Sequence, residues 1–291
     1  MILRANGPLD YRIMYDFMAV QDDCLYTTVD QKVRKAESFD GRRVLFELSE
    51  SAEPDSVNVE ILYNEGVEEK VVAAYVTDWF DLDYDLNRFY KFAGGNARLR
   101  EVTQRLHGFR MLAYVDIVDV LVWSIIGQQI NMKFAFALKR RLVEHFNHSV
   151  EYEGEQYRLM PSAEELLTLS VKEMREMQIS TRKAEYIRNC AQGIIDGELS
   201  KEYLQSFEHY DAAKAHLTKV KGIGPWSANV VLMRTIKFRH AIPVGDAGLR
   251  NAFKITDQLD DKPDRAYMEK IMSEWGAFGT YATLYTWRIL G

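Results

Sequence analysis

The residues LTKVKGIGPWSANVVLMRTIKFRHAIPVGDAGLR, from Leu217 to Arg250, are the most informative stretch of this chain. Gly222, Ile223 and Gly224 form a two-glycine turn between two segments with the apolar spacing of helices. Glycine has no Cβ, so another group can approach the backbone closely at this turn. Pro225 stands where a helix would begin, and the free amides of a first helical turn bind phosphate well. The stretch therefore predicts a phosphate-binding hairpin, to which Ser227 adds an amide or a hydroxyl group.

A single carboxylate, Asp246, follows this hairpin in the next loop, directly after Pro243-Val244-Gly245. A carboxylate beside bound phosphate can stabilise a developing positive charge or orient a water molecule. Asp246 is equally suited to capping a helix that begins near Ala247 or Gly248. The two roles are compatible, and both stay open at this point.

The composition is that of an ordinary soluble globular protein, with 47% apolar and 27% charged residues. No apolar run is long enough to cross a bilayer, and the first residues lack the layout of a secretion signal, so a cytoplasmic protein is expected. Two distant cysteines cannot supply a thiol-rich metal site. The net charge of −6 argues mildly against nucleic acid as a partner, although a local basic face matters more than the total. The bases near the expected contact segments are Lys133, Arg182, Lys183, Lys219 and Lys221.

The first 83 residues have the texture of an antiparallel sheet with at least one helix. Apolar and polar residues alternate around Val44, Phe46 and Leu48 and again from Val57 to Tyr63. The turn signal at 64–66 predicts that Glu69–Val76 returns as a partner strand. Asp10–Val20 is expected to be a short helix leading into this sheet.

From Leu82 onward the pattern is helical. Asp119–Ile126 is almost entirely apolar and predicts a buried helix. Further helices are expected at Ser162–Leu169, Val171–Met177, Lys183–Ile195, Tyr267–Trp275 and Tyr281–Leu290. The chain is therefore expected to be of the α+β class, with the sheet first and helices after it.

The pattern Leu217-x-x-Val220-x-Gly222-Ile223-Gly224-x-Trp226-Ser227-Ala228, with Asp246 twenty residues beyond Trp226, resembles the helix–hairpin–helix DNA glycosylase superfamily. Within it, the bacterial 3-methyladenine DNA glycosylase II family is the most similar. The resemblance covers nearly the whole chain. It also includes Pro8-Leu9-Asp10-Tyr11, Asp81–Asp85, Ile126–Ile130 and Ile179–Ala184.

This resemblance implies a fold, a reaction and a partner. The fold is an N-terminal antiparallel sheet domain (1–83) and two mainly α-helical subdomains with a cleft between them. One subdomain comprises 84–116 plus 239–291, and the other comprises 117–238 and ends in the helix–hairpin–helix motif. The implied reaction is hydrolysis of the N-glycosidic bond of alkylated purines in duplex DNA, after base flipping, which leaves an abasic site. The partner is double-stranded DNA with damaged bases, and a monomer without membrane attachment is expected.

The resemblance also assigns roles to single residues. Asp246 is the catalytic carboxylate, and Trp226, Trp287 and Phe17 line the base pocket, where aromatic rings favour a cationic purine. Gln129 takes the position of the side chain pushed into the duplex, while Gly222, Ile223, Gly224 and Ser227 contact the DNA strand. Val230 stands where the family has another pocket tyrosine, which changes the expected shape of the pocket.

Cofactor expectations follow from the same comparison. The backbone carbonyls of Thr218, Val220 and Gly222 match positions that hold a structural monovalent cation. No iron–sulfur cluster and no other cofactor is expected. Trp226 replaces the lysine that acts as the Schiff-base nucleophile in bifunctional members, so a monofunctional enzyme is predicted.

Two alternative functions remain. The first is a glycosylase for oxidised or deaminated purines. The second is a helix–hairpin–helix protein that binds DNA or senses damage without catalysis.

Overall fold

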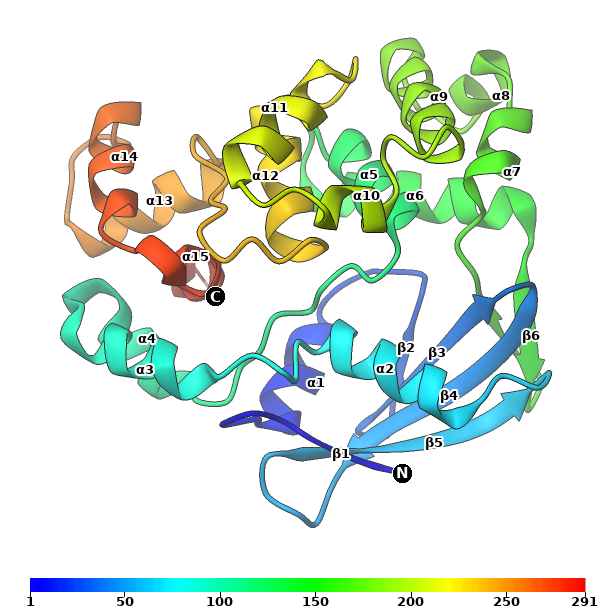
Figure 1. The fold of residues 1–291 in the computed structure, drawn as a ribbon, viewed down its shortest axis with the longest axis horizontal. Coiled ribbons are helices and arrows are strands. Elements are labelled where there is room, and N and C mark those ends of the chain that lie inside the picture. Colours follow the sequence, from blue (N-terminus) through cyan, green and yellow to red (C-terminus); the bar gives the residue numbers. More distant parts are fainter. Residues whose placement is uncertain (291) are drawn as a thin grey trace.

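The computed structural model describes residues 1–290 and shows an antiparallel sheet beside two groups of helices (Figure 1). The five strands of the sheet lie in the order β1-β5-β4-β3-β2, and all neighbouring pairs are antiparallel. The alternating segments around Phe46 and Val59 form the central pair of strands, as predicted. The strands are β1 (Ile2–Arg4), β2 (Thr27–Val29), β3 (Lys32–Phe39), β4 (Arg42–Glu50) and β5 (Ser56–Asn64).

Two helices cover one face of this sheet: α1 (Tyr11–Ala19), as predicted, and α2 (Glu69–Trp79). The expectation of a strand at Glu69–Val76 is wrong. The buried residues of α2 are spaced as on one face of a helix, and they pack against the same core as the inner face of β4. They are Val72, Tyr75, Val76 and Trp79.

A second sheet interrupts the helical part of the chain and was not predicted. Strands β6 (Ser149–Tyr152) and β7 (Glu155–Arg158) form a hairpin that packs Val150 and Tyr157 against Leu45, on the other face of the main sheet. Both turn residues, Glu153 and Gly154, have positive φ, as two-residue hairpins require. The hairpin ties the middle of the chain to the N-terminal sheet.

The remaining elements are helices in two groups (Figure 1). The buried helix predicted at Asp119–Ile126 is present as α5 (Ile117–Ile126), and all of its residues except Asp119 are buried. The first group is α3 (Leu86–Gly95), α4 (Ala97–Arg105), α13 (Ala247–Thr256), α14 (Arg265–Ser273) and α15 (Gly279–Trp287), with short 3-10 turns at Gly276–Phe278 and Arg288–Leu290. The second group is α5 (Ile117–Ile126), α6 (Met132–Phe146), α7 (Ala163–Thr168), α8 (Val171–Glu176), α9 (Thr181–Ile195), α10 (Lys201–Gln205), α11 (Tyr210–Lys219) and α12 (Pro225–Arg234).

Two large hydrophobic cores correspond to these groups. One core contains buried residues from Ala5 to Ala113 together with residues from Ile242 to Tyr285, so it joins the sheet to the first group of helices. The other contains only residues between Ile117 and Ala241. Trp287 packs against both cores. The Asp246 loop thus comes directly after the point where the chain leaves the second core and returns to the first.

A buried ion-pair network joins the sheet domain to the segment that leads to the Asp246 loop. The carboxylate of Asp81 is 1% exposed. It accepts two hydrogen bonds from Arg239, at 2.6 and 2.8 Å, and one from the Tyr281 hydroxyl at 2.9 Å. Lys237 lies 3.1 Å from the same carboxylate. The network therefore fixes the position of Lys237 and Arg239, which precede the Asp246 loop in the chain.

Within residues 1–290 the structure contains no helix of the length and apolar character needed to cross a membrane.

Candidate active site

The hairpin between α11 and α12 has the geometry that its glycines predict. Gly222 has a φ of +112°, a conformation that L side chains rarely adopt. A Cβ on Gly222 would also lie 2.5 Å from Cγ of Tyr186 on α9, so only glycine lets α9 pack this closely. Gly224, in contrast, is exposed and has no atom within 4 Å of the position of a Cβ. It precedes α12, and no side chain caps the first-turn amides of that helix. These amides are therefore open to an anion.

Two side chains hold the hairpin from behind. Gln128, just after α5, donates through Nε2 to the carbonyl of Gly222 at 3.0 Å and to Oγ of Ser227 at 3.3 Å. Asn189 of α9 donates to the carbonyl of Lys221 at 3.3 Å. Gln128 was not identified from the sequence, although it lies next to the predicted wedge residue.

Four residues of the hairpin were predicted to contact DNA, and two of them, Ile223 and Ser227, have buried side chains. Ser227 is 2% exposed and its hydroxyl lies between Gln128 and the carbonyl of Ser124, so the predicted hydroxyl contact with phosphate is wrong. Its backbone amide in the first turn of α12 is the group that remains. Ile223 is 3% exposed and belongs to the second core, so it contributes only backbone. Gly222 and Gly224 supply the accessible backbone of the turn.

Asp246 lies where three helices meet, and it is half-buried. It is the N-cap of α13, because Oδ1 accepts the amide of Leu249 at 3.0 Å. The indole Nε1 of Trp287 donates to the same oxygen at 2.8 Å, and Nε1 of Trp226 donates to Oδ2 at 2.9 Å. Three donors from α12, α13 and α15 thus fix the orientation of this carboxylate.

A glycine makes this arrangement possible. A Cβ on Gly248 would lie 3.0 Å from Oδ1 of Asp246 and 3.1 Å from Cδ1 of Trp287. The edge of the indole therefore lies directly against the backbone of α13. No local pattern marks this role, since it depends on a tryptophan 39 residues further along the chain.

Phe17, the third residue predicted to line the base pocket, is connected to this site through Arg288. Its ring packs edge-on against Phe109, with centroids 5.2 Å apart, and lies 4.7 Å from the guanidinium carbon of Arg288. Arg288 follows Trp287, so Phe17 lies beside the end of α15 that carries the second indole. Val230 is 3% exposed and buried in the second core, four residues after Trp226 on α12.

The predicted wedge residue is presented to solvent. Gln129 is exposed and has a φ of +58°, in the loop between α5 and α6. Two large apolar side chains that were not predicted follow it on α6: Met132 is 56% exposed and Phe134 is 37% exposed.

The carbonyls predicted to hold a cation are partly used within the protein. The carbonyl of Val220 accepts the amide of Ile223 at 3.0 Å, and that of Gly222 accepts Gln128. The Thr218 hydroxyl donates back into α11, to the carbonyl of Lys214 at 2.9 Å. A carbonyl oxygen has two lone pairs, so both engaged carbonyls keep one. Residues 1–290 contain no cluster of three His, Cys, Asp or Glu side chains suited to a metal ion.

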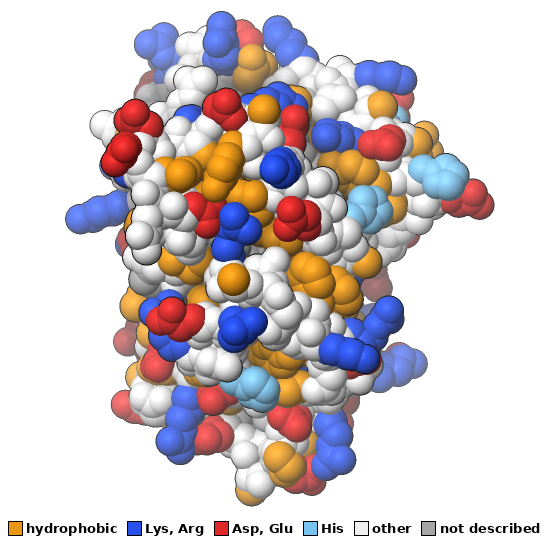
Figure 2. All heavy atoms as spheres, turned by 90° about the vertical axis from the view of Figure 1, so that its left-hand side faces the viewer, with side chains coloured by type: hydrophobic (Ala, Val, Ile, Leu, Met, Phe, Trp, Pro, Cys, Tyr) orange, Lys and Arg blue, Asp and Glu red, His pale blue; other side chains and the backbone are white. Residues whose placement is uncertain are grey.

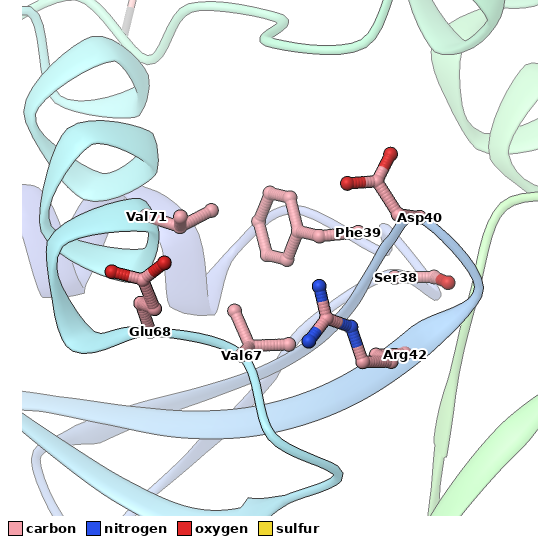
Figure 3. Close-up of a pocket in the computed structure, with 7 residues that line it drawn as sticks. All are labelled: Ser38, Phe39, Asp40, Arg42, Val67, Glu68 and Val71. Atoms are coloured by element: carbon pink, nitrogen blue, oxygen red, sulfur yellow. The ribbon is translucent and has the colours of Figure 1, made fainter.

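One cavity of the molecule is remote from these residues. It has a volume of about 390 Å³ and lies between α2 and the β3–β4 turn (Figure 3). Phe39, Val67 and Val71 form its apolar side, and Arg42 of β4 donates across its rim to the carbonyl of Gly66. It contains none of the residues around Asp246. The end of the molecule formed by α3, α4, α13 and α14 carries acidic and basic side chains interspersed, without a continuous basic face (Figure 2).

Comparison with known proteins agrees with this geometry. Residues 122–277 match the HhH-GPD superfamily of base excision DNA repair proteins, and residues 16–121 match the N-terminal domain of 8-oxoguanine DNA glycosylase. The chain is 37% identical to a DNA-3-methyladenine glycosylase of Bacillus subtilis over 219 residues, which cover 75% of this chain and 72% of that protein.

Solved structures show the same fold. A 3-methyladenine DNA glycosylase from Archaeoglobus fulgidus matches with a TM-score of 0.86 at 24% identity, over 99% of this chain and 97% of that one. An 8-oxoguanine glycosylase/lyase from Clostridium acetobutylicum, in complex with double-stranded DNA, matches with a TM-score of 0.74 at 20% identity, over 98% of this chain and 93% of that one. The predicted α+β fold, with a five-stranded antiparallel sheet followed by helices, is confirmed. With a family match over more than half of its length, the chain belongs to the HhH-GPD superfamily of base excision DNA repair proteins.

Proposed function

We propose that this protein is a monofunctional DNA glycosylase that removes alkylated purines of the 3-methyladenine type from duplex DNA and leaves an abasic site. The observation that carries the proposal is the carboxylate of Asp246, which two indole N–H groups orient beside a hairpin with open amides. The Bacillus subtilis relative named DNA-3-methyladenine glycosylase supports the choice of substrate.

The reaction follows from these positions. A base inside a duplex is out of reach of side chains, so the nucleotide must rotate out of the helix. The amides at the start of α12 hold a phosphate of the strand, and Gln129 fills the space that the base leaves. Cleavage of the glycosidic bond builds positive charge on the sugar, and Asp246 stabilises that charge and orients the attacking water. The electrons of the bond leave with the base, for which an alkylated cationic purine is a good leaving group.

Trp226 makes the enzyme monofunctional. Strand cleavage by bifunctional glycosylases requires an amine that attacks the sugar, and an indole nitrogen is no such nucleophile. In this chain the corresponding side chain instead donates a hydrogen bond to Asp246 at 2.9 Å. The product is therefore an intact strand with an abasic site.

The same proposal covers the partner and the setting. The enzyme binds damaged double-stranded DNA as a monomer in the bacterial cytosol, through the hairpin and the Gln129 loop, and needs no iron–sulfur cluster. A monovalent cation held by the carbonyls of Thr218, Val220 and Gly222 would stiffen the hairpin. The exposed Lys221 beside the turn lies 4.0 Å from Glu185, which a DNA phosphate would have to displace as its partner.

Chromatography of the bases released from methylated duplex DNA tests this function. We expect release of 3-methyladenine, with the strand intact until hot alkali cleaves it at the abasic site. Duplexes with 8-oxoguanine or hypoxanthine are assayed in parallel. Release of these bases in preference to methylated purines would favour the oxidised- or deaminated-purine alternative. Tight binding of lesions without any abasic product would favour the damage sensor.

Gly248→Ala is expected to lower the rate of base release by about tenfold, because the added methyl group displaces the indole of Trp287 from Asp246. Stability should not fall to the same degree, since alanine favours a helix more than glycine does. Single-turnover rates and thermal melting separate the two effects. Gly94→Ala on α3 is the matched control, because a Cβ on Gly94 would have no atom within 4 Å. This variant should keep the full rate of base release. A Gly248→Ala enzyme as fast as this control would remove the positioning role.

A further inference from the structure

Helix α9 contacts both of the loops through which the protein is proposed to bind DNA. Three of its residues, Lys183, Tyr186 and Asn189, are spaced by three and therefore lie on the same side of the helix. Tyr186 lies against the hairpin, since a Cβ on Gly222 would meet its Cγ at 2.5 Å. Asn189 donates to the carbonyl of Lys221 at 3.3 Å. Two of the three residues thus support the hairpin.

The third residue, Lys183, holds the end of α5. Its Nζ donates to the carbonyl of Ile126, the last residue of α5, at 2.7 Å. The last carbonyls of a helix have no partner within the helix, and their partial negative charge suits an ammonium group. Burial alone shifts the pKa of Lys183, and it does so downward, so no carboxylate among residues 1–290 offsets it. The ammonium group is therefore directed at the helix end and not at a DNA phosphate.

The loop that presents Gln129 begins at this helix end. Gln129 stands three residues beyond Ile126, and its φ of +58° is uncommon for a side chain other than glycine. Such a conformation persists only where the surrounding contacts hold the backbone. On its N-terminal side the contacts are the bond of Lys183 to Ile126 and the bonds of Gln128 to the hairpin. On its C-terminal side Asn131 caps α6. The Gln129 loop is thus fixed at both ends.

The hairpin, the Gln129 loop and α9 are joined in a closed set of contacts. Gln128 joins the loop to the hairpin. Tyr186 and Asn189 join the hairpin to α9, and Lys183 joins α9 to the start of the loop. The separation between the open amides of α12 and Gln129 cannot change without breaking one of these contacts. Base eversion needs the strand to be held while the vacated space is filled, so this separation matters for the rate.

We propose that Lys183 is a positioning residue for base eversion. By holding the carbonyl of Ile126, it keeps Gln129 at a fixed distance from the hairpin that binds the strand. Lys183 therefore acts through Gln129 and makes no contact of its own with DNA. The inference rests on the proposed function and adds a residue to it.

The test is Lys183→Met, which keeps the apolar stem and removes the charge and the donor. We expect the single-turnover release of 3-methyladenine from methylated duplex DNA to fall by about tenfold, because the Gln129 loop is no longer held in place. In a Gln129→Ala background the same substitution should change the rate by less than about twofold, since the side chain that it misplaces is gone. Lys183→Gln, with a side chain one atom shorter and without charge, is a second variant that should show the same loss.

Binding to undamaged duplex DNA separates positioning from direct contact. The affinity of Lys183→Met, measured over a range of salt concentrations, should fall with log salt at the same slope as that of the wild type. A lysine that bound a phosphate would reduce this slope by about 0.9 when it is removed. A smaller slope would therefore overturn the inference.

The matched control is Lys172→Met, since Lys172 is exposed on α8 in the same group of helices. Thermal melting checks that both variants are folded at the assay temperature. Base release by Lys183→Met at the rate of this control would overturn the inference, and so would an equal fall in the presence and absence of Gln129. A Gln129→Ala enzyme with the wild-type rate would overturn it as well.

These results leave the proposed function in place, provided that the wild type releases methylated bases and Asp246→Asn is slowed. A wild type without glycosylase activity would instead overturn the proposed function, and the inference with it.

Discussion

Asp246→Asn is expected to slow the release of 3-methyladenine from duplex DNA by about 10²–10³-fold, the usual effect of removing one preorganised charge at a transition state. In the wild type both carboxylate oxygens accept indole N–H groups, and Oδ1 also accepts the amide of Leu249. Asparagine has only one acceptor oxygen, so its amide group would face an indole donor. The variant thus loses the negative charge beside the sugar and the fixed orientation of the group. Single-turnover kinetics with a methylated duplex measure the loss.

A matched control separates chemistry from folding. Asp264 caps α14 as Asp246 caps α13, with its carboxylate accepting the amide three residues on, at 2.8 Å. Asp264→Asn should therefore cost a similar amount of capping energy, roughly 1 kcal/mol or less, and keep its activity. The affinity of Asp246→Asn for duplex DNA should stay near the wild-type value, since the hairpin is unchanged. Base release at an undiminished rate would rule out the assigned role of Asp246.

Asp81→Ala is expected to lower the free energy of unfolding by about 3 kcal/mol, because it leaves the largely buried guanidinium of Arg239 without its carboxylate partner. Arg239 would lose both of its hydrogen bonds to the carboxylate, and the buried Tyr281 hydroxyl would lose its acceptor. Urea unfolding at neutral pH measures the change. Asp83→Ala, two residues away and exposed, is the control and should change stability by less than about 0.5 kcal/mol. Equal stability of the two variants would show that the network contributes nothing.

The contribution of Asp81 should depend on pH. Burial acts to raise the pKa of this carboxyl, but the hydrogen bonds and charge of Arg239, followed by Lys237, outweigh burial and leave the pKa below its ordinary value. A carboxyl with a lowered pKa stabilises the fold above its unfolded pKa of about 3.9 and loses that effect as the pH falls through the folded value. The difference in stability between wild type and Asp81→Ala should therefore be constant from pH 5 to 8 and shrink below about pH 4.

Local patterns predicted the parts of this protein that are local in sequence. The turn at Gly222 and the proline-led start of α12 depend on backbone conformations that few residues besides glycine and proline favour, so sequence alone was enough. The strand predicted at Glu69–Val76 failed because valines at 71, 72 and 76 also suit a helix whose buried face meets a sheet. The hairpin at Ser149–Arg158 was missed although Glu153-Gly154 is a usable turn signal.

The roles of residues that act through contacts with distant parts of the chain could not be predicted from local sequence patterns. Trp287 was placed in the site only by family resemblance, and its hydrogen bond to Asp246 joins residues 41 positions apart. The importance of Gly248 depends on that contact, and the burial of the Ser227 hydroxyl depends on Gln128, 99 positions away.

The two cores also set an order of events during synthesis. The core between Ile117 and Ala241 is continuous in sequence, so it can form on the ribosome as soon as that stretch emerges. The other core needs residues from Ala5 to Ala113 and partners beyond Ile242, so the N-terminal half must wait with its apolar faces incompletely covered. A nascent chain that has not passed Trp287 would contain a finished hairpin but no oriented carboxylate. A polypeptide that ends before Trp287 would therefore keep the hairpin but lack the two-sided orientation of Asp246.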